Sequence, residues 1–137
     1  MKKTVREYRD IVDYAAFKRI RTHIAQSKFE DLHGLAKNTC FYFESKKRIL
    51  GLGTLLPVLE AYECTLYVNG VKLTDAMQLI DMLEEEKEKR GLSEHGLAVA
   101  MGLKGINLGF YRQGYTPRTT KLLQMCKGLG WEVQIDG

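Results

Sequence analysis

Residues 91–114 read GLSEHGLAVAMGLKGINLGFYRQG and decide the expected fold. Gly91 is typical of the end of one helix, and Ser93 of the capped start of the next. Apolar residues then recur with the spacing that packs two short helices together: Leu97, Met101, Leu103, Leu108 and Tyr111. Gly102 lies between these helices, where a tight turn takes a positive φ that a Cβ would make costly. The stretch therefore predicts two short helices joined by a turn, the arrangement of a helix-turn-helix.

The pattern occurs twice along the chain. Residues 52–70 read LGTLLPVLEAYECTLYVNG, and residues 119–137 read TTKLLQMCKGLGWEVQIDG. Both contain a Leu-Leu pair, apolar residues at helical spacing, a short β-prone run and a final Asn-Gly or Asp-Gly. These stretches are offset by 67 residues, and Gly34-Leu35 recurs as Gly102-Leu103 at an offset of 68. An internal repeat of this kind predicts two related lobes in one chain.

The first lobe is assigned to residues 1–70 and the second to residues 71–137. The elements expected in the first lobe are helices over about 4–25, up to Gly34, over 36–45 and over 53–62, then a strand over 65–68 and a hairpin turn at Asn69-Gly70. Those expected in the second lobe are helices over 75–90, around Gly102 and over 119–129, then a strand over 131–135. The two strands are expected to pair across a pseudo-two-fold axis. The expected fold class is all-α, with two lobes that each end in a short β-strand.

Composition indicates a globular chain rather than a disordered or membrane-spanning one. The 137 residues are 45% hydrophobic and 28% charged, a balance that allows a buried core. No run of 18 apolar residues occurs, and no apolar stretch follows the basic start, so we expect no membrane span and no signal peptide. The three cysteines are odd in number and widely spaced, which favours a reducing compartment and a cytoplasmic location. The net charge of +4 does not by itself identify a partner.

Motifs of enzymes and metal sites are missing from the sequence. It has no Ser-His-Asp order, no phosphate-cradling glycine loop and no HExxH pattern. His23, His33 and His95 are far apart and have no cysteine at ligand spacing. We therefore expect a protein that is not an enzyme and needs neither a metal nor a cofactor.

The stretch over 91–114 resembles the phage-repressor-like helix-turn-helix family of the Cro/XRE type. The matching positions are Leu97, Ala98, Met101, Gly102, Leu103, Leu108, Tyr111 and Gly114. The first copy, residues 29–62, is similar to the same family without gaps. Glu30 departs from the small residue that the family usually has there, and Arg112 replaces its usual Glu. The resemblance implies two lambda-repressor-like lobes in tandem.

The family contacts DNA from the start of the first motif helix and from the outward face of the second. Carried onto the first copy, the resemblance implies contacts by Gln26, Lys37, Asn38, Thr39 and Tyr42. Such side chains can bond base edges or meet a thymine methyl group or a phosphate. The family grips the phosphate backbone just after this helix, where the first copy has Lys46, Lys47 and Arg48.

The second copy has residues that suit DNA contact less well than those of the first copy. At the equivalent positions it has Glu94, Gly105, Ile106, Asn107 and Phe110. An acid at the backbone contact and a glycine on the reading helix do not suit DNA. The other candidate contacts of this lobe are Lys104, Asn107, Arg112 and Gln113.

These residues predict a sequence-specific regulator of transcription, of the repressor type, that inserts a helix into the major groove of double-stranded DNA. A single chain could address two half-sites roughly 34 Å apart. In the other arrangement the protein is a homodimer in which the second lobe assembles and the first reads. The alternative function is a protein-interaction module such as an antitoxin or a phage-encoded inhibitor of a host protein. Ile106 and Phe110, if exposed, would give its second lobe an apolar patch for a protein partner.

Overall fold

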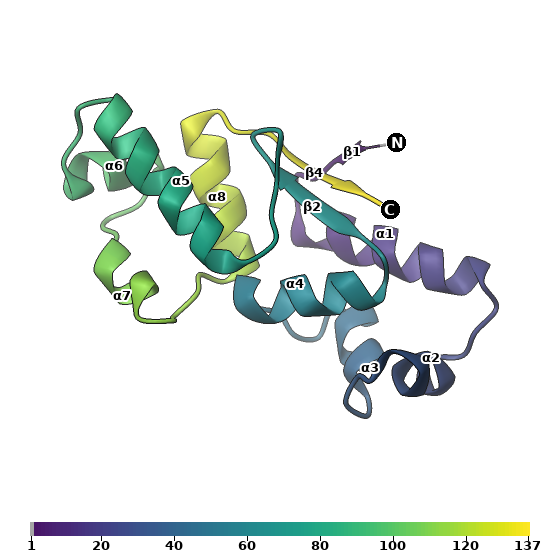
Figure 1. The fold of residues 1–137 in the computed structure, drawn as a ribbon. Helices are drawn as coiled ribbons and strands as arrows, with labels where there is room; N and C mark the ends of the chain where they lie inside the picture. The colour runs from purple at the N-terminus through teal and green to yellow at the C-terminus, as the bar shows by residue number, and fades with distance from the viewer. Residues whose placement is uncertain (1) are drawn as a thin grey trace.

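The computed structural model describes residues 2–137 and shows the same series of elements twice (Figure 1). The first half contains β1 (Lys3–Thr4), α1 (Tyr8–Arg21), α2 (Gln26–His33), α3 (Thr39–Glu44), α4 (Leu52–Ala61) and β2 (Thr65–Val68). The second half contains β3 (Val71–Lys72), α5 (Ala76–Lys89), α6 (Glu94–Ala100), α7 (Leu108–Arg112), α8 (Thr119–Leu129) and β4 (Val133–Asp136). Each series is a strand, four helices and a strand, as the internal repeat suggests.

The expected all-α class is wrong, because the strands form one sheet that belongs to both halves. Over residues 2–137 the protein is mixed α/β, with eight helices and a four-stranded antiparallel sheet in the order β1-β4-β2-β3. The predicted pairing of the two closing strands is confirmed: β2 and β4 run antiparallel from Thr65 opposite Asp136 to Val68 opposite Val133. Because strands from both halves join in one sheet, the sheet is a layer of the fold in its own right. Two short strands that each closed a separate lobe would not form such a layer.

The edge strands are exchanged between the halves. β1 begins the first half and pairs with β4 at the end of the second, with Lys3 opposite Ile135. β3 begins the second half and pairs with β2 at the end of the first, across the predicted hairpin turn at Asn69-Gly70. The two ends of the chain consequently lie beside each other (Figure 1).

A second reciprocal contact lies where α4 and α8 begin. The Leu52 N–H donates to the Pro117 carbonyl at 2.9 Å, and the Thr119 N–H donates to the Leu50 carbonyl at 3.2 Å. Gly51 and Arg118 form an isolated antiparallel bridge between these bonds. Each half thus gives the other the same donor and the same acceptor, which is the pattern of a two-fold axis.

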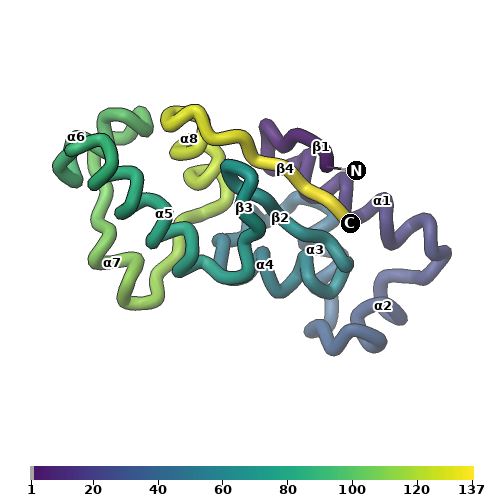
Figure 2. The backbone as a smooth tube through the Cα atoms, turned by 45° about the horizontal axis from the view of Figure 1, so that its top comes forward, coloured from purple at the N-terminus to yellow at the C-terminus, as the bar shows by residue number. Residues whose placement is uncertain are grey.

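One hydrophobic core runs through both halves. Its fully buried large side chains come from the first half at Phe43, Leu52, Leu55 and Leu66 and from the second at Leu79, Leu97, Met101 and Leu108. Figure 2 shows the sheet across the middle of the molecule, with α1–α3 toward one end and α5–α7 toward the other. Within residues 2–137, none of the helices is both long and apolar enough to cross a membrane.

The helix predicted from Thr4 begins at Tyr8 instead. Residues before it are used by the sheet, because the Val5 N–H donates to the Val133 carbonyl at 2.8 Å. The helix start is fixed by Asp10, whose carboxylate accepts from the N–H of Glu7 at 3.0 Å. In the second half, the predicted helix cap and the predicted turn glycines are confirmed. The Ser93 hydroxyl caps α6 by accepting from the Gly96 N–H, and Gly91 and Gly102 both have positive φ.

Gly128 is the position where α8 packs most closely against the end of α6. A Cβ built there would lie 2.5 Å from the Met101 Cα and 2.8 Å from the Ala100 carbonyl oxygen. We expect Gly128→Ala to lower the free energy of unfolding by roughly 1–3 kcal/mol, because backbone must move to admit the methyl group. Urea unfolding followed by circular dichroism measures this loss.

The matched control is Gly105→Ala. No atom lies within 4 Å of a Cβ built at Gly105, so the free energy of unfolding should change by less than about 0.5 kcal/mol. Equal losses in the two variants would contradict the close approach of α8 to α6.

Candidate nucleic-acid interface

The first half presents α2 and α3 as two short helices joined by a tight turn. α2 ends at Gly34, which has a φ of 65°, and the Leu35 N–H donates back to the Glu30 carbonyl at 2.9 Å. Asn38 has a φ of 69° and directly precedes α3 without using its side chain as a cap. The helix predicted over 36–45 is therefore shorter, and Lys37 and Asn38 lie in the turn before it.

The candidate residues of this half divide into exposed and engaged side chains. The exposed ones are Lys37, Asn38, Tyr42, Lys46, Lys47 and Arg48. Thr39 is half-buried, and its hydroxyl donates to the Ala36 carbonyl at 2.7 Å. Gln26 is also half-buried, and its side chain contributes to the lowered pKa of the Glu44 carboxyl. Its role as a DNA contact stays a prediction.

Four of the candidates converge on one hollow beside α3. Lys37, Thr39, Tyr42 and Arg48 line a space of about 290 Å³, whose floor includes Val58 of α4. The Arg48 guanidinium lies 4.4 Å from the centre of the Tyr42 ring, which holds the cation against an aromatic face. This arrangement places a hydrogen-bonding cation and an aromatic edge on one outward surface.

Lys46 and Lys47 differ in how free their charges are. The Lys46 ammonium lies 2.7 Å from a carboxylate oxygen of Asp13, so its charge is partly offset. The Lys47 ammonium lies 5.1 Å from the centre of the Phe41 ring, and within residues 2–137 it has no ion pair within 4.0 Å. Lys47 is thus the freer cation of the two.

α3 and the turns on either side of it carry no exposed carboxylate of their own, although Asp13 of α1 pairs with Lys46. Glu44 is the single acid between Leu32 and Leu59, and its side chain is only 8% exposed. Both of its oxygens accept from the Arg19 guanidinium at 2.7 Å, and one also accepts from the Tyr62 hydroxyl at 2.7 Å. The cations of the surface are consequently not neutralised by neighbours on α3.

Burial and hydrogen bonding oppose each other at Glu44. Burial raises the pKa of its carboxyl, but the hydrogen bonds from Arg19 and Tyr62 and the charge of Arg19 outweigh burial and lower the pKa overall. The carboxylate therefore stays ionised at neutral pH and fastens α3 to α1. Burial also raises the pKa of the Tyr62 hydroxyl, which keeps its proton available to donate.

Glu30 is the second acid that is turned inward. Its buried carboxylate accepts from the N–H of Asn38 at 3.2 Å and from the N–H of Cys40 at 2.8 Å. It therefore ties α2 to the first turn of α3. Sequence reasoning treated Glu30 only as a departure from a small residue, although its place one turn before Gly34 could have indicated a carboxylate directed at the next helix.

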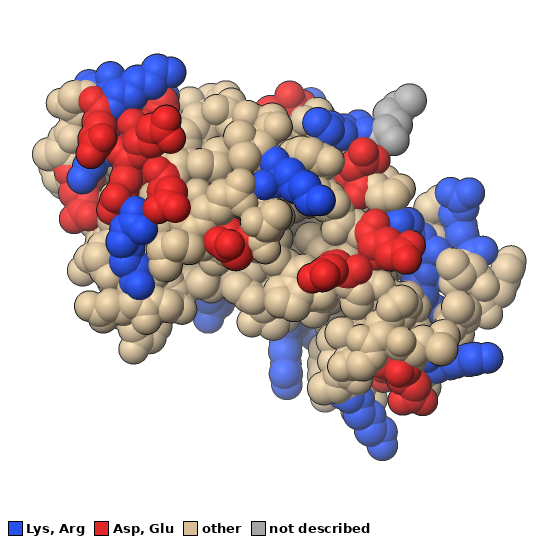
Figure 3. All heavy atoms as spheres, viewed as in Figure 1, with Lys and Arg blue, Asp and Glu red and all other residues tan. Residues whose placement is uncertain are grey.

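The equivalent surface of the second half is neutralised. Both oxygens of Glu84 accept from the Arg112 guanidinium, at 3.1 and 2.7 Å, and Asp81 lies 2.8 Å from it. Asn107 caps α7 by accepting from the Phe110 N–H at 3.0 Å. Figure 3 shows Asp and Glu gathered over α5 at this end of the molecule. Arg112 and Asn107 are engaged within the fold here.

The remaining candidates of the second half are Lys104 and Gln113, and both are exposed. Glu94 accepts from the Leu108 N–H at 3.0 Å, so this acid is a structural tie between α6 and α7. Ile106 packs partly against the core.

Phe110 and Tyr115 form the most prominent aromatic feature of this half. Their rings stack at 4.1 Å with an angle of 7°, and the residues are 45% and 55% exposed. They occupy the places that Tyr42 and Arg48 have in the first half. The second half thus has an apolar pair where the first has a cation on an aromatic ring.

The possible metal ligands and the cysteines also have defined positions in the described chain. Among residues 2–137, no group of three His, Cys, Asp or Glu side chains could hold a metal ion. The cysteines are unpaired and buried. Burial raises the pKa of Cys126 to about 12 and of Cys64 to about 11, so both thiols are protonated near neutral pH.

Comparison with protein-family models, curated proteins and solved structures finds no match to this chain.

Glu44→Gln should destabilise the protein and flatten its response to acid. Removing the charge leaves Arg19 without its buried partner, a loss of roughly 3 kcal/mol in the free energy of unfolding. Because the pKa of Glu44 is lowered by folding from an ordinary value of 4.5, its contribution is present above that pH and is lost as the pH falls through the lower folded value. Urea unfolding between pH 7 and pH 3 measures both effects.

Glu84→Gln is the matched control, since it removes the acid that binds Arg112 at the exposed surface of the second half. Exposed ion pairs contribute little, so this variant should stay closer to the wild-type protein at pH 7. A parallel fall of stability with acid in wild-type and Glu44→Gln proteins would contradict the assignment to Glu44.

Proposed function

We propose that the chain binds double-stranded DNA sequence-specifically and regulates transcription as a repressor. The proposed contact surface, here called the α3 surface, consists of Lys37, Asn38, Tyr42, Lys47 and Arg48. The observation that carries the proposal is the asymmetry of charge around α3. Within residues 2–137, the exposed cations Lys37, Lys47 and Arg48 have no carboxylate partner within 4.0 Å, while the acids Glu30 and Glu44 are bound inside the fold.

The chemistry of the α3 surface suits both parts of a DNA contact. Asn38 offers an amide that can donate to and accept from an adenine edge, and Lys37 can donate to guanine acceptors. Lys47 and Arg48 follow α3 and can bind phosphate oxygens. Tyr42 lies between these groups, where its ring can meet a thymine methyl group. We assign base contacts to Lys37 and Asn38 and backbone contacts to Lys47 and Arg48.

A second candidate function is supported by Phe110 and Tyr115. An exposed stacked pair of aromatic rings is more typical of a protein interface than of a DNA surface. On this alternative the second half binds a partner protein, as an antitoxin or an inhibitor of another protein would. Arg112, already bound by two acids, would add nothing to DNA binding there.

Selection of the purified protein against a random duplex library tests sequence specificity. At about 0.15 M salt, nonspecific binding through phosphates is already weak. We expect one sequence to be enriched. Enrichment of a single half-site would indicate that only the first half of the protein contacts bases. Enrichment of a repeated half-site would indicate that two base-contacting surfaces bind one duplex. Retention of all sequences alike would overturn the proposal and favour a protein partner.

Alanine variants test the assigned contacts. Lys37→Ala and Asn38→Ala should each weaken binding to the selected duplex by roughly 1–3 kcal/mol and relax the sequence preference. Arg48→Gln should weaken binding to all duplexes alike and lower the salt dependence by about one phosphate contact. Fluorescence anisotropy with selected and scrambled duplexes measures these effects.

Lys104→Ala is the matched control. It removes an exposed lysine from the turn before α7, the counterpart in the second half of the turn that carries Lys37. Its affinity should stay within about twofold of the wild-type value, since an isolated exposed charge contributes little. If Lys104→Ala and Lys37→Ala weaken binding equally, the assignment of base contacts to the first half is wrong.

A further inference from the structure

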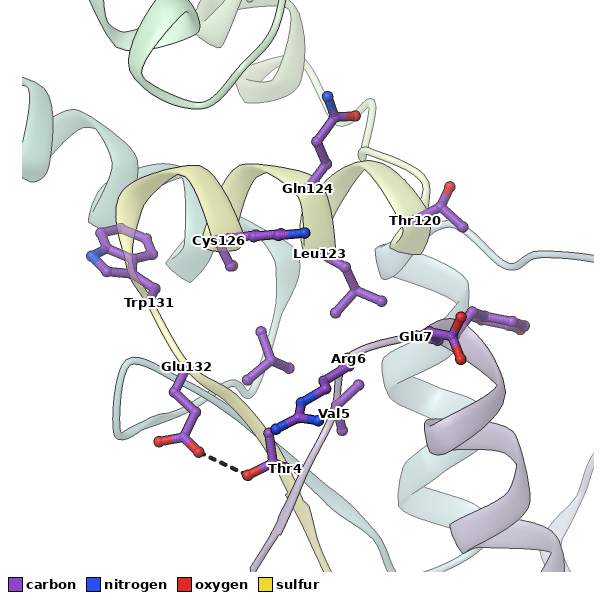
Figure 4. Close-up of a pocket in the computed structure, with 13 residues that line it drawn as sticks. Thr4, Val5, Arg6, Glu7, Thr120, Leu123, Gln124, Cys126, Trp131 and Glu132 are labelled. Atoms are coloured by element: carbon purple, nitrogen blue, oxygen red, sulfur yellow. Dashed lines mark hydrogen bonds between the residues drawn. The ribbon is translucent and has the colours of Figure 1, made fainter.

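A hollow lies at the junction of the two halves. It has a volume of about 840 Å³ and lies between the segment from β1 into α1 and the segment from α8 into β4. Figure 4 shows Leu123 pointing from α8 into this space, with Trp131 at one end and Arg6 across from the helix. The volume is in the range of small-molecule sites. A ligand here would contact both halves at once.

The acids that line the hollow have partners within the fold, whereas two of its cations have no carboxylate partner in the described chain. Glu132 accepts from the Thr4 hydroxyl at 2.8 Å, as Figure 4 also shows, and Glu7 binds Arg9 at 2.7 Å. Within residues 2–137, neither Arg6 nor Lys127 has a carboxylate partner within 4.0 Å. The acids are thus engaged with other groups, whereas two cations remain available beside an apolar wall.

The pseudo-two-fold repeat supplies an internal comparison. An equivalent hollow lies between α4, β2 and β3, and its volume is only about 350 Å³. There the place of Arg6 is taken by Thr74, that of Lys127 by Glu60 and that of Trp131 by Cys64. The smaller hollow is lined by one cation, Lys72, together with two acids, Glu60 and Glu63, and it has no aromatic ring. The larger size, the pair of cations without carboxylate partners in the described chain and the indole therefore distinguish the junction beside β1.

We propose that this hollow binds an amphipathic organic anion, with a flat apolar body and a single carboxylate or sulfonate group. The body packs between Leu123 and the indole of Trp131, where it removes apolar surface from water. The anionic group lies at Arg6 and Lys127, whose charges have no competing partner in the described chain. This site is separate from the α3 surface and does not depend on DNA binding.

Trp131 gives a direct measurement, because it is the one tryptophan in the sequence. The probe is 1-anilinonaphthalene-8-sulfonate, and its comparison is N-phenyl-1-naphthylamine, which has the same rings without the sulfonate. We expect the anionic probe to bind at one site, to quench Trp131 and to bind about tenfold more tightly than the uncharged amine, as a charge-assisted contact allows.

The double variant Arg6→Gln/Lys127→Gln should lose that preference, so that the sulfonate binds about tenfold more weakly and the amine is unaffected. Both side chains are exposed, so the melting temperature should be retained. Lys89→Gln, which removes an exposed charge at the end of α5, is the matched control and should behave as wild type. Equal affinity for the two probes, an unchanged affinity of the double variant for the sulfonate, or binding that leaves Trp131 emission unchanged would overturn the proposal.

Discussion

The antiparallel pairing of β2 with β4 is the constraint on which the rest of the structure depends. It joins the last strand of each half, so neither half closes its own sheet. The reciprocal bonds between Leu52 and Pro117 and between Thr119 and Leu50 repeat the same relationship among the helices. A lobe of about 70 residues has little core of its own, and here both lobes share one continuous core.

Within this symmetric frame the two halves use their charges in opposite ways. The position of Glu44 in the first half corresponds to that of Arg112 in the second. Glu44 is held inside by Arg19 and Tyr62, which leaves the cations of the α3 surface uncompensated. Arg112 is held outside by Asp81 and Glu84, which neutralises the matching surface. The first half thus has an acid, and the second half a base, at this equivalent position, and the surface of the first half is basic while that of the second is neutralised.

The sequence predicts the number and order of the long elements well, because apolar periodicity, Gly102 and Asn69-Gly70 are local signals. It fails at β1, where Lys3–Thr4 have no strand pattern and gain their partner only from β4 at the other end of the chain. For the same reason the class was wrong: strand exchange depends on long-range pairing. At the candidate surface the exposure of Lys37 and Asn38 follows from the turn, whereas the internal bonds of Asn107 and Arg112 depend on partners that spacing cannot identify.

The order of the strands also has a consequence for how the protein is made. β4 (Val133–Asp136) follows the other strands in sequence, yet it lies between β1 and β2 in the sheet. During synthesis β1 emerges long before β4, so its partner in the sheet is missing until β4 has been translated. The β1–β4 pairing is therefore a contact of high sequence separation, which forms late because the intervening chain must first be closed into a loop.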